Sequence, residues 1–114
     1  MKIAYIAHPI GGNVKSNLMK VRKIARQINI DEPDTLPFAP YYLDCICMDD
    51  SNPEERERGI KNDTYLLETG IIDELRLYGD QISKGMYDEI LIALREQIEV
   101  VPMTPETKIA YLNL

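Results

Sequence analysis

The stretch KIAYIA at residues 2–7, followed by HPIGGN at residues 8–13, decides how this chain folds. The first stretch is a short apolar run, which predicts a buried strand. The second contains a proline and paired glycines, which are typical of a turn. Beyond it, apolar residues recur with the period of an α-helix and mark one face, made of Val14, Leu18, Val21, Ile24, Ala25 and Ile28. The chain thus begins with a strand, a turn and an amphipathic helix.

The alternation of strands and helices continues along the chain. Short apolar runs predict further strands at residues 35–40, 71–79 and 98–102. Capping residues and helical periodicity predict further helices at residues 53–69 and 83–97. Residues 41–50 fit either a helical turn or a loop, and residues 104–114 either a short helix or a last strand. The pattern predicts an α/β fold: a single domain over residues 1–114, with a Rossmann- or flavodoxin-like parallel sheet of about four or five strands and helices on both faces.

Two of these segments carry expectations about burial. In the strand at 71–79, leucines alternate with polar residues, which predicts a polar face that meets solvent, a ligand or another subunit; its residues are Glu74, Arg76 and Tyr78. In the helix at 83–97, the residues expected to form the buried stripe are Met86, Ile90, Ala93 and Leu94.

Composition restricts the partners. The chain has 114 residues, 45% of them hydrophobic and 28% charged, which is ordinary for a soluble globular domain. Its formal net charge is -6, and this disfavours binding to a nucleic-acid polymer, which needs a basic face. A small phosphorylated ligand remains compatible with that charge, because a single helix N-terminus binds a phosphate locally.

Cysteine usage and the N-terminal sequence point to a cytoplasmic protein. Cys45 and Cys47 are too close together to staple distant segments and too few for a structural zinc site, so we expect free thiols in a reducing compartment. The first apolar run is too short for a signal peptide or a membrane span. We therefore expect no membrane partner.

Three pieces of sequence point to one ligand site at the C-terminal ends of the strands, where parallel sheets bind their ligands. Tyr5 near the end of the first strand is followed by the loop 8–12, whose glycines let backbone N–H groups approach a ligand. Ser83 and Gly85 open a helix, where a hydroxyl, a backbone N–H and the helix dipole attract an anion. Glu89 lies one turn further along the same side. Taken singly, each piece also has a structural interpretation: a plain turn, a helix cap and a solvated glutamate.

Together, the strand tyrosine, the glycine loop and the motif Ser-x-Gly-x-x-x-Glu-Ile at residues 83–90 resemble the nucleoside 2-deoxyribosyltransferase superfamily. The spacing of its serine and glycine before the glutamate is similar to that of the deoxynucleoside 5′-monophosphate N-glycosidases. Two stretches resemble a small branch found largely in phages and bacteria: PEER at residues 53–56 and GDQISKGM at residues 79–86. The resemblance covers nearly the whole chain.

The resemblance implies a nucleotide- or nucleoside-processing enzyme of the N-glycosidase or 2-deoxyribosyltransferase type. Glu89 would attack the anomeric carbon of the sugar and release the base, forming a covalent glycosyl-glutamate, while Tyr5 would hydrogen-bond that carboxylate. Ser83 and Gly85 would bind a 5′-phosphate or a 5′-hydroxyl. The other expected ligand-binding residues are His8, Pro9, Gly11, Gly12, Gly79, Asp80 and Met86. The resemblance further implies no metal, no cofactor, and a homodimer or larger homo-oligomer, located in the host cytoplasm if the chain is phage-encoded.

Three features depart from the family pattern. Ser83 replaces the aspartate usual in deoxyribosyltransferases, which favours nucleotides over free nucleosides. The acid that protonates the leaving base has three candidates, Asp63, Asp73 and Asp80, and a histidine found after the second strand in relatives is replaced near Tyr41. The alternative hypothesis is therefore a non-catalytic nucleotide-binding protein of the same fold, for instance a phage-encoded protein that sequesters a nucleotide signal.

The ionisation of Glu89 is a separate expectation. Placed in the first turn of its helix and hydrogen-bonded by Tyr5, its carboxylate is expected to stay ionised, because the helix dipole and the hydrogen bond both favour the charged form. Desolvation in the site opposes them, and we expect it to be the weaker effect.

Overall fold

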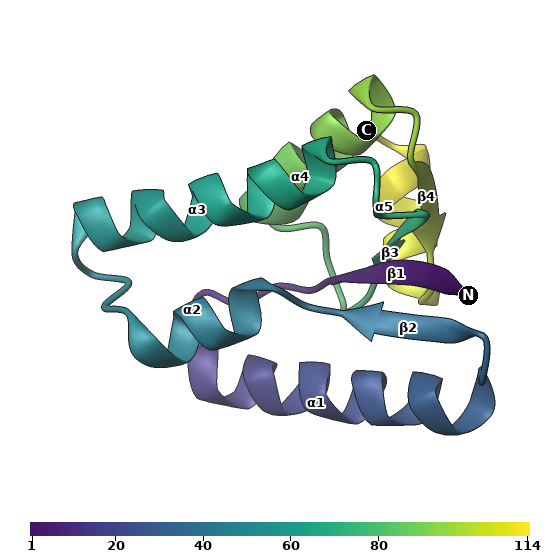
Figure 1. Cartoon of the computed structure of the whole chain (residues 1–114), viewed down its shortest axis with the longest axis horizontal. Coiled ribbons are helices and arrows are strands. Elements are labelled where there is room, and N and C mark those ends of the chain that lie inside the picture. Colours follow the sequence, from purple (N-terminus) through teal and green to yellow (C-terminus); the bar gives the residue numbers. More distant parts are fainter.

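A parallel sheet of four strands forms the middle of the structure, a computed structural model that describes residues 1–114 (Figure 1). The strands are β1 (Lys2–Ala7), β2 (Thr35–Phe38), β3 (Glu74–Leu77) and β4 (Glu99–Pro102). Their order is β2-β1-β3-β4, and each strand runs parallel to its neighbours. The predicted α/β fold with a parallel sheet is confirmed, and the number of strands is four.

The helices lie on both faces of this sheet, as predicted. They are α1 (Val14–Asp31), α2 (Tyr41–Cys47), α3 (Pro53–Glu68), α4 (Lys84–Arg95) and α5 (Pro105–Leu112). Figure 1 shows α1 on one side of the sheet and α3 with α4 on the other. Both ambiguous segments are helical, since residues 41–47 form α2 and the end of the chain forms α5. None of the helices is long and apolar enough to cross a membrane.

Side-chain caps explain where the helices begin. The side chains of Asn13, Asn52, Ser83 and Thr104 each accept a hydrogen bond from a backbone N–H in the first turn of α1, α3, α4 and α5. These bonds satisfy N–H groups that have no partner inside the helix. After α3, Gly70 adopts a φ of 85°, a conformation that glycine reaches without strain and that ends the helix.

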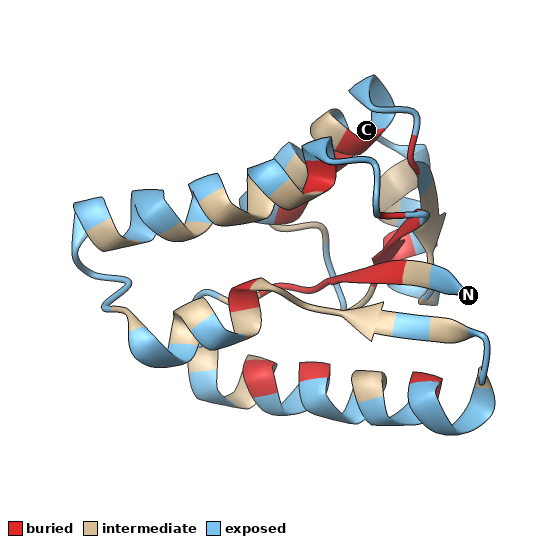
Figure 2. Cartoon of the chain, viewed as in Figure 1, coloured by how far each residue is buried: buried red, intermediate tan, exposed pale blue.

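The core fills both faces of the sheet, against α1 on one side and α4 on the other (Figure 2). Tyr5, Leu75 and Leu77 of the central strands are fully buried there, together with the Met86, Ile90 and Ala93 side chains of α4. The prediction that Leu94 completes this stripe is wrong, because its side chain is 55% exposed. Leu94 lies about 100° around the helix from Ala93, which turns it away from the sheet.

The predicted environment of the polar face of the third strand is also wrong. Glu74 and Arg76 are each only 5% exposed, because β3 lies in the middle of the sheet. The Arg76 guanidinium donates to Glu74 and, through two nitrogens 2.7 and 2.8 Å away, to the Glu32 carboxylate. The Lys2 ammonium lies 3.3 Å from Glu74. The charges are therefore buried as a compensated network instead of meeting solvent, a ligand or another subunit.

Candidate functional site

Tyr5 and Glu89 meet at the centre of the site. Tyr5 is fully buried on β1, and its hydroxyl donates a hydrogen bond to the Oε2 atom of Glu89 on α4. The two residues are 84 positions apart in sequence, so the fold brings them together. The predicted contact between them is confirmed.

The expected ionisation of Glu89 is wrong. Burial raises the pKa of its carboxyl group from 4.5 to about 8, against the opposing effect of the Tyr5 hydrogen bond. The helix α4 begins at Lys84, which places Glu89 in the second turn, and the stabilising effect of the dipole fades within the first. Desolvation therefore outweighs the hydrogen bond and favours the protonated form of Glu89 in the free protein.

A crevice of about 180 Å³ lies near this pair, between α2, α3 and the start of α4, although neither Tyr5 nor Glu89 is among its lining residues. Its floor includes Tyr41, whose ring lies 6.1 Å from that of Tyr5 and whose hydroxyl donates to the Ile6 carbonyl at 2.6 Å. Gly85, one turn before Glu89, lines the same crevice. We call this space the α2–α3 crevice; its lining residues are Tyr41, Asp44, Cys45, Met48, Asp49, Asp50, Glu55, Arg56, Gly59, Ile60, Asp63 and Gly85.

Asp63 is the one of the three candidate acids that lines the crevice. Its Oδ1 atom is buried and has no hydrogen-bond partner, and burial followed by the nearby Asp44 raises its pKa from 3.8 to about 7. Asp73, by contrast, accepts the Ile3 backbone N–H at 2.7 Å, before β3 begins and so at the other end of the sheet. Asp80 is exposed in the loop after β3. The sequence alone left the choice among these three acids open. The signal that favours Asp63 is its spacing of four residues from both Gly59 and Leu67, which places the three residues on the inner face of α3.

The raised pKa values make stability depend on pH. Both carboxyl groups bind protons more tightly in the folded chain, so the free energy of unfolding falls as the pH rises from about 4, through the pKa values of about 7 and 8, and levels off above them. Glu89→Gln removes one of these groups. We expect the variant to melt a few degrees higher than the wild type at pH 9 and to show a smaller difference at pH 5. Equal melting temperatures of the two proteins across this range, measured by circular dichroism, would contradict the burial of Glu89.

Ser83 and Gly85 lie at the start of α4 as predicted. The Ser83 hydroxyl oxygen accepts the Met86 N–H at 3.3 Å, so its first role is that of a helix cap, and its own proton remains available for a ligand. Gly85 is exposed to the crevice. Met86, which is also among the predicted ligand-binding residues, has its side chain in the core and its N–H bonded to Ser83.

The loops after β1 and β3 lie against each other, also as predicted. Gly79 has a φ of 90°, and a Cβ atom at this position would lie 2.7 Å from the Cδ atom of Pro9. Only glycine therefore allows this contact. His8 is buried, with its Nδ1 atom 2.6 Å from the Pro9 carbonyl oxygen, while Gly11 and Gly12 are exposed. The first loop thus supports the end of the sheet, and its glycines face open space.

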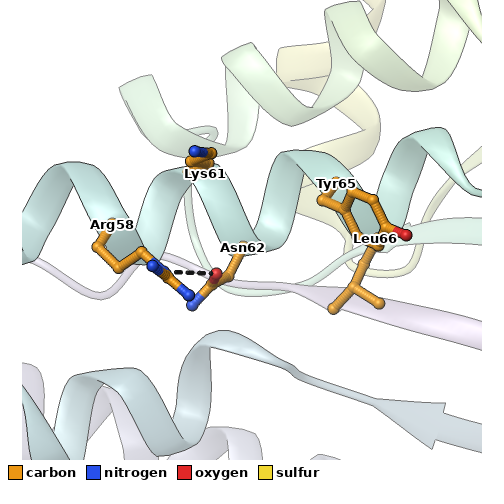
Figure 3. A pocket seen from close by; sticks show the side chains of 5 residues that line it. All are labelled: Arg58, Lys61, Asn62, Tyr65 and Leu66. Atoms are coloured by element: carbon orange, nitrogen blue, oxygen red, sulfur yellow. Dashed lines mark hydrogen bonds between the residues drawn. The ribbon is translucent and has the colours of Figure 1, made fainter.

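Other reactive groups lie outside this arrangement. Cys45 and Cys47 are free, as expected, and burial raises the pKa of the Cys45 thiol to about 11, which makes it a poor nucleophile at neutral pH. No three histidine, cysteine or carboxylate side chains are placed to hold a metal ion. A larger hollow of about 410 Å³ lies along α3, away from Glu89 (Figure 3). Arg58, which donates to Asn62 there, is among its lining residues, but none of the predicted site residues is.

Residues 2–103 match the model of a protein family, Domain of unknown function (DUF7768). No protein with a curated description matches the chain. The matched region contains all four strands and the helices α1 to α4, and therefore the whole site described above.

Proposed function

The chain belongs to the family described as Domain of unknown function (DUF7768), and from its site we propose that it cleaves the N-glycosidic bond of a nucleotide or nucleoside. The observation that carries the proposal is the hydrogen bond from Tyr5 to Glu89, close to Tyr41 and Gly85, which line the α2–α3 crevice. A carboxylate oriented by a buried tyrosine, next to a space open to a ligand, suits attack on an anomeric carbon.

In this proposal Asp63 is the acid that protonates the leaving base. A general acid works best when its pKa lies near the working pH, and that of Asp63 is raised to about 7. A negative charge on Asp63 raises the pKa of Glu89, so Glu89 ionises more easily while Asp63 keeps its proton. The ionised Glu89 then forms a bond to the anomeric carbon as the base departs with the proton from Asp63. Water completes the cycle by releasing the sugar, with Asp63 now acting as the base.

The α4 N-terminus is the proposed binding site for a 5′-phosphate. Ser83→Ala removes the hydroxyl donor and the cap, so we expect it to weaken the binding of nucleoside monophosphates by about 1–2 kcal/mol. The parent nucleosides should lose much less affinity. Calorimetric titration of both ligands separates this role from a general loss of stability, which would affect the two equally. An equal loss for both refutes the phosphate role of Ser83.

We further propose a homodimer or larger homo-oligomer as the working form. Large apolar side chains remain exposed on the outer faces of α3 and α4, among them Tyr65, Leu91 and Leu94. A second copy that covers them would bury surface that a monomer leaves in water. Light scattering at micromolar concentration should give at least twice the mass of one chain, and a monomeric mass contradicts this assembly.

A second candidate function is nucleotide binding without cleavage. The raised pKa of Glu89, at about 8, favours this alternative, because a protonated carboxyl group is a poor nucleophile. Incubation of the wild type with a panel of deoxyribonucleotides, ribonucleotides and their nucleosides, followed by chromatography for free base, decides between the two. Release of a base supports the glycosidase. If a nucleotide binds but no base is released from any compound, the result supports the binding protein and rejects the glycosidase.

A further inference from the structure

The wall of the α2–α3 crevice is dominated by unpaired carboxylates. Five acidic residues line it against a single basic one, Arg56; they are Asp44, Asp49, Asp50, Glu55 and Asp63. None of the five forms an ion pair with a lysine or arginine side chain; the ion pairs of this chain lie elsewhere. The partners that do occur are neutral, as where Asp49 accepts the N–H and hydroxyl of Ser51. The crevice therefore has a strong negative potential.

Three further features indicate what kind of ligand balances this charge. The carboxylates are not grouped as metal ligands, because no three of them are placed to hold an ion. The buried Oδ1 atom of Asp63 lacks a partner inside the protein, which is costly unless a ligand supplies one. Tyr41 is also among the lining residues, and the face of an aromatic ring attracts a flat, delocalised cation.

We propose that the base held in the α2–α3 crevice is a positively charged aromatic ring, so that the substrate is an N-glycosyl pyridinium or a similar cationic nucleoside or nucleotide. The inference rests on the proposed function, since it names the substrate class of the same site. The charges determine the orientation of the bound substrate: its cationic base faces the carboxylates, and its sugar faces Glu89 and Gly85. A 5′-phosphate, where present, lies at the start of α4.

With such a substrate the base leaves without a proton, so Asp63 is not needed as the acid of the first step and acts only as the base of the second. A carboxylate oxygen of Glu89 bonds to the anomeric carbon while the bond from that carbon to the ring nitrogen breaks. The electron pair of the broken bond returns to the nitrogen, and the pyridinium leaves as a neutral pyridine. Water then attacks the glycosyl-glutamate, Asp63 accepts its proton, and the free sugar and the Glu89 carboxylate are regenerated. Cleavage removes the positive charge from the base, which also weakens the electrostatic attraction between the departing base and the carboxylates of the crevice.

Binding to the Glu89→Gln variant tests the charge preference apart from catalysis. Nicotinamide riboside and its reduced dihydro form have nearly the same size and differ by one positive charge, so they serve as matched probes in calorimetric titrations. We expect the cationic form to bind at least about tenfold more tightly. Asp44→Asn, added to this variant, should reduce the ratio of the two affinities severalfold. If Asp44→Asn disturbs the fold, Asp50→Asn replaces it and should reduce the same ratio. Glu57→Gln is the matched control, since Glu57 is exposed on α3 outside the crevice, and it should leave the ratio unchanged.

Cleavage by the wild type separates the failure of this inference from that of the proposed function. Release of nicotinamide from nicotinamide riboside, faster than release of adenine from deoxyadenosine or its monophosphate, supports both. Release of adenine with no preference for the cationic probes in binding or cleavage overturns the substrate class and leaves the glycosidase intact. Absence of base release from every compound overturns the proposed function, and equal binding of the two matched probes then overturns the cationic preference as well.

Discussion

Glu89→Gln should abolish base release while the fold is retained. A glutamine amide is a far weaker nucleophile than a carboxylate, so the rate should fall by at least about three orders of magnitude. The change keeps the shape of the side chain and leaves an oxygen to accept the Tyr5 hydroxyl hydrogen bond. The measurement is free base formed per enzyme under saturating substrate, with circular dichroism to check the fold.

A neighbouring carboxylate provides the control for this loss. Asp88→Asn removes an exposed acid from the same helix, where it pairs with Lys84 at 3.1 Å. Such exposed pairs contribute little, so this variant should retain the activity of the wild type within about twofold. Activity of Glu89→Gln close to that of Asp88→Asn would assign the nucleophile to another group.

Arg76→Leu should cause the largest loss of stability from a single change. It leaves Glu74 buried with only the half-exposed Lys2 ammonium nearby, and it frees Glu32 from its two hydrogen bonds. Breaking a buried ion pair by removing one partner costs about 3–5 kcal/mol. Urea denaturation followed by circular dichroism should show a correspondingly lower midpoint with a similar slope.

Arg95→Leu is the matched control for that experiment. Arg95 pairs with Glu68 at 2.7 Å, but both side chains are largely exposed. Its loss should cost no more than about 1 kcal/mol. If Arg76→Leu costs no more than Arg95→Leu, the buried network does not hold the middle of the sheet together.

Local sequence patterns explain why much of the fold was predictable. The run at residues 2–7, the glycine turn after it and the caps at Asn52 and Ser83 act over a few residues, so their effects are visible in the sequence. The placement of Ser83 and Glu89 on one helix was predictable from the same kind of local signal, because it depends only on their spacing and on the helix cap.

What could not be predicted depends on contacts between distant segments. The burial of Arg76 depends on Glu32, 44 residues earlier, and an alternating strand pattern does not reveal that both faces are covered. The raised pKa of Glu89 depends on burial against β1 and on Asp63. The proposal of Asp63 as the acid, in place of Asp73 or Asp80, likewise depends on the arrangement of α2, α3 and α4 around the crevice.

The most direct test of the account is to locate the sugar on the enzyme during turnover. Wild-type protein is mixed with a substrate that it cleaves, quenched with acid before the reaction is complete, digested and analysed by mass spectrometry. The account predicts that the peptide containing Glu89 carries the added mass of the sugar or sugar phosphate, and that fragmentation places it on Glu89. Base released in the same samples with the sugar on another residue, or with no glycosylated peptide at any time of quenching, would contradict the assignment of Glu89 as the nucleophile.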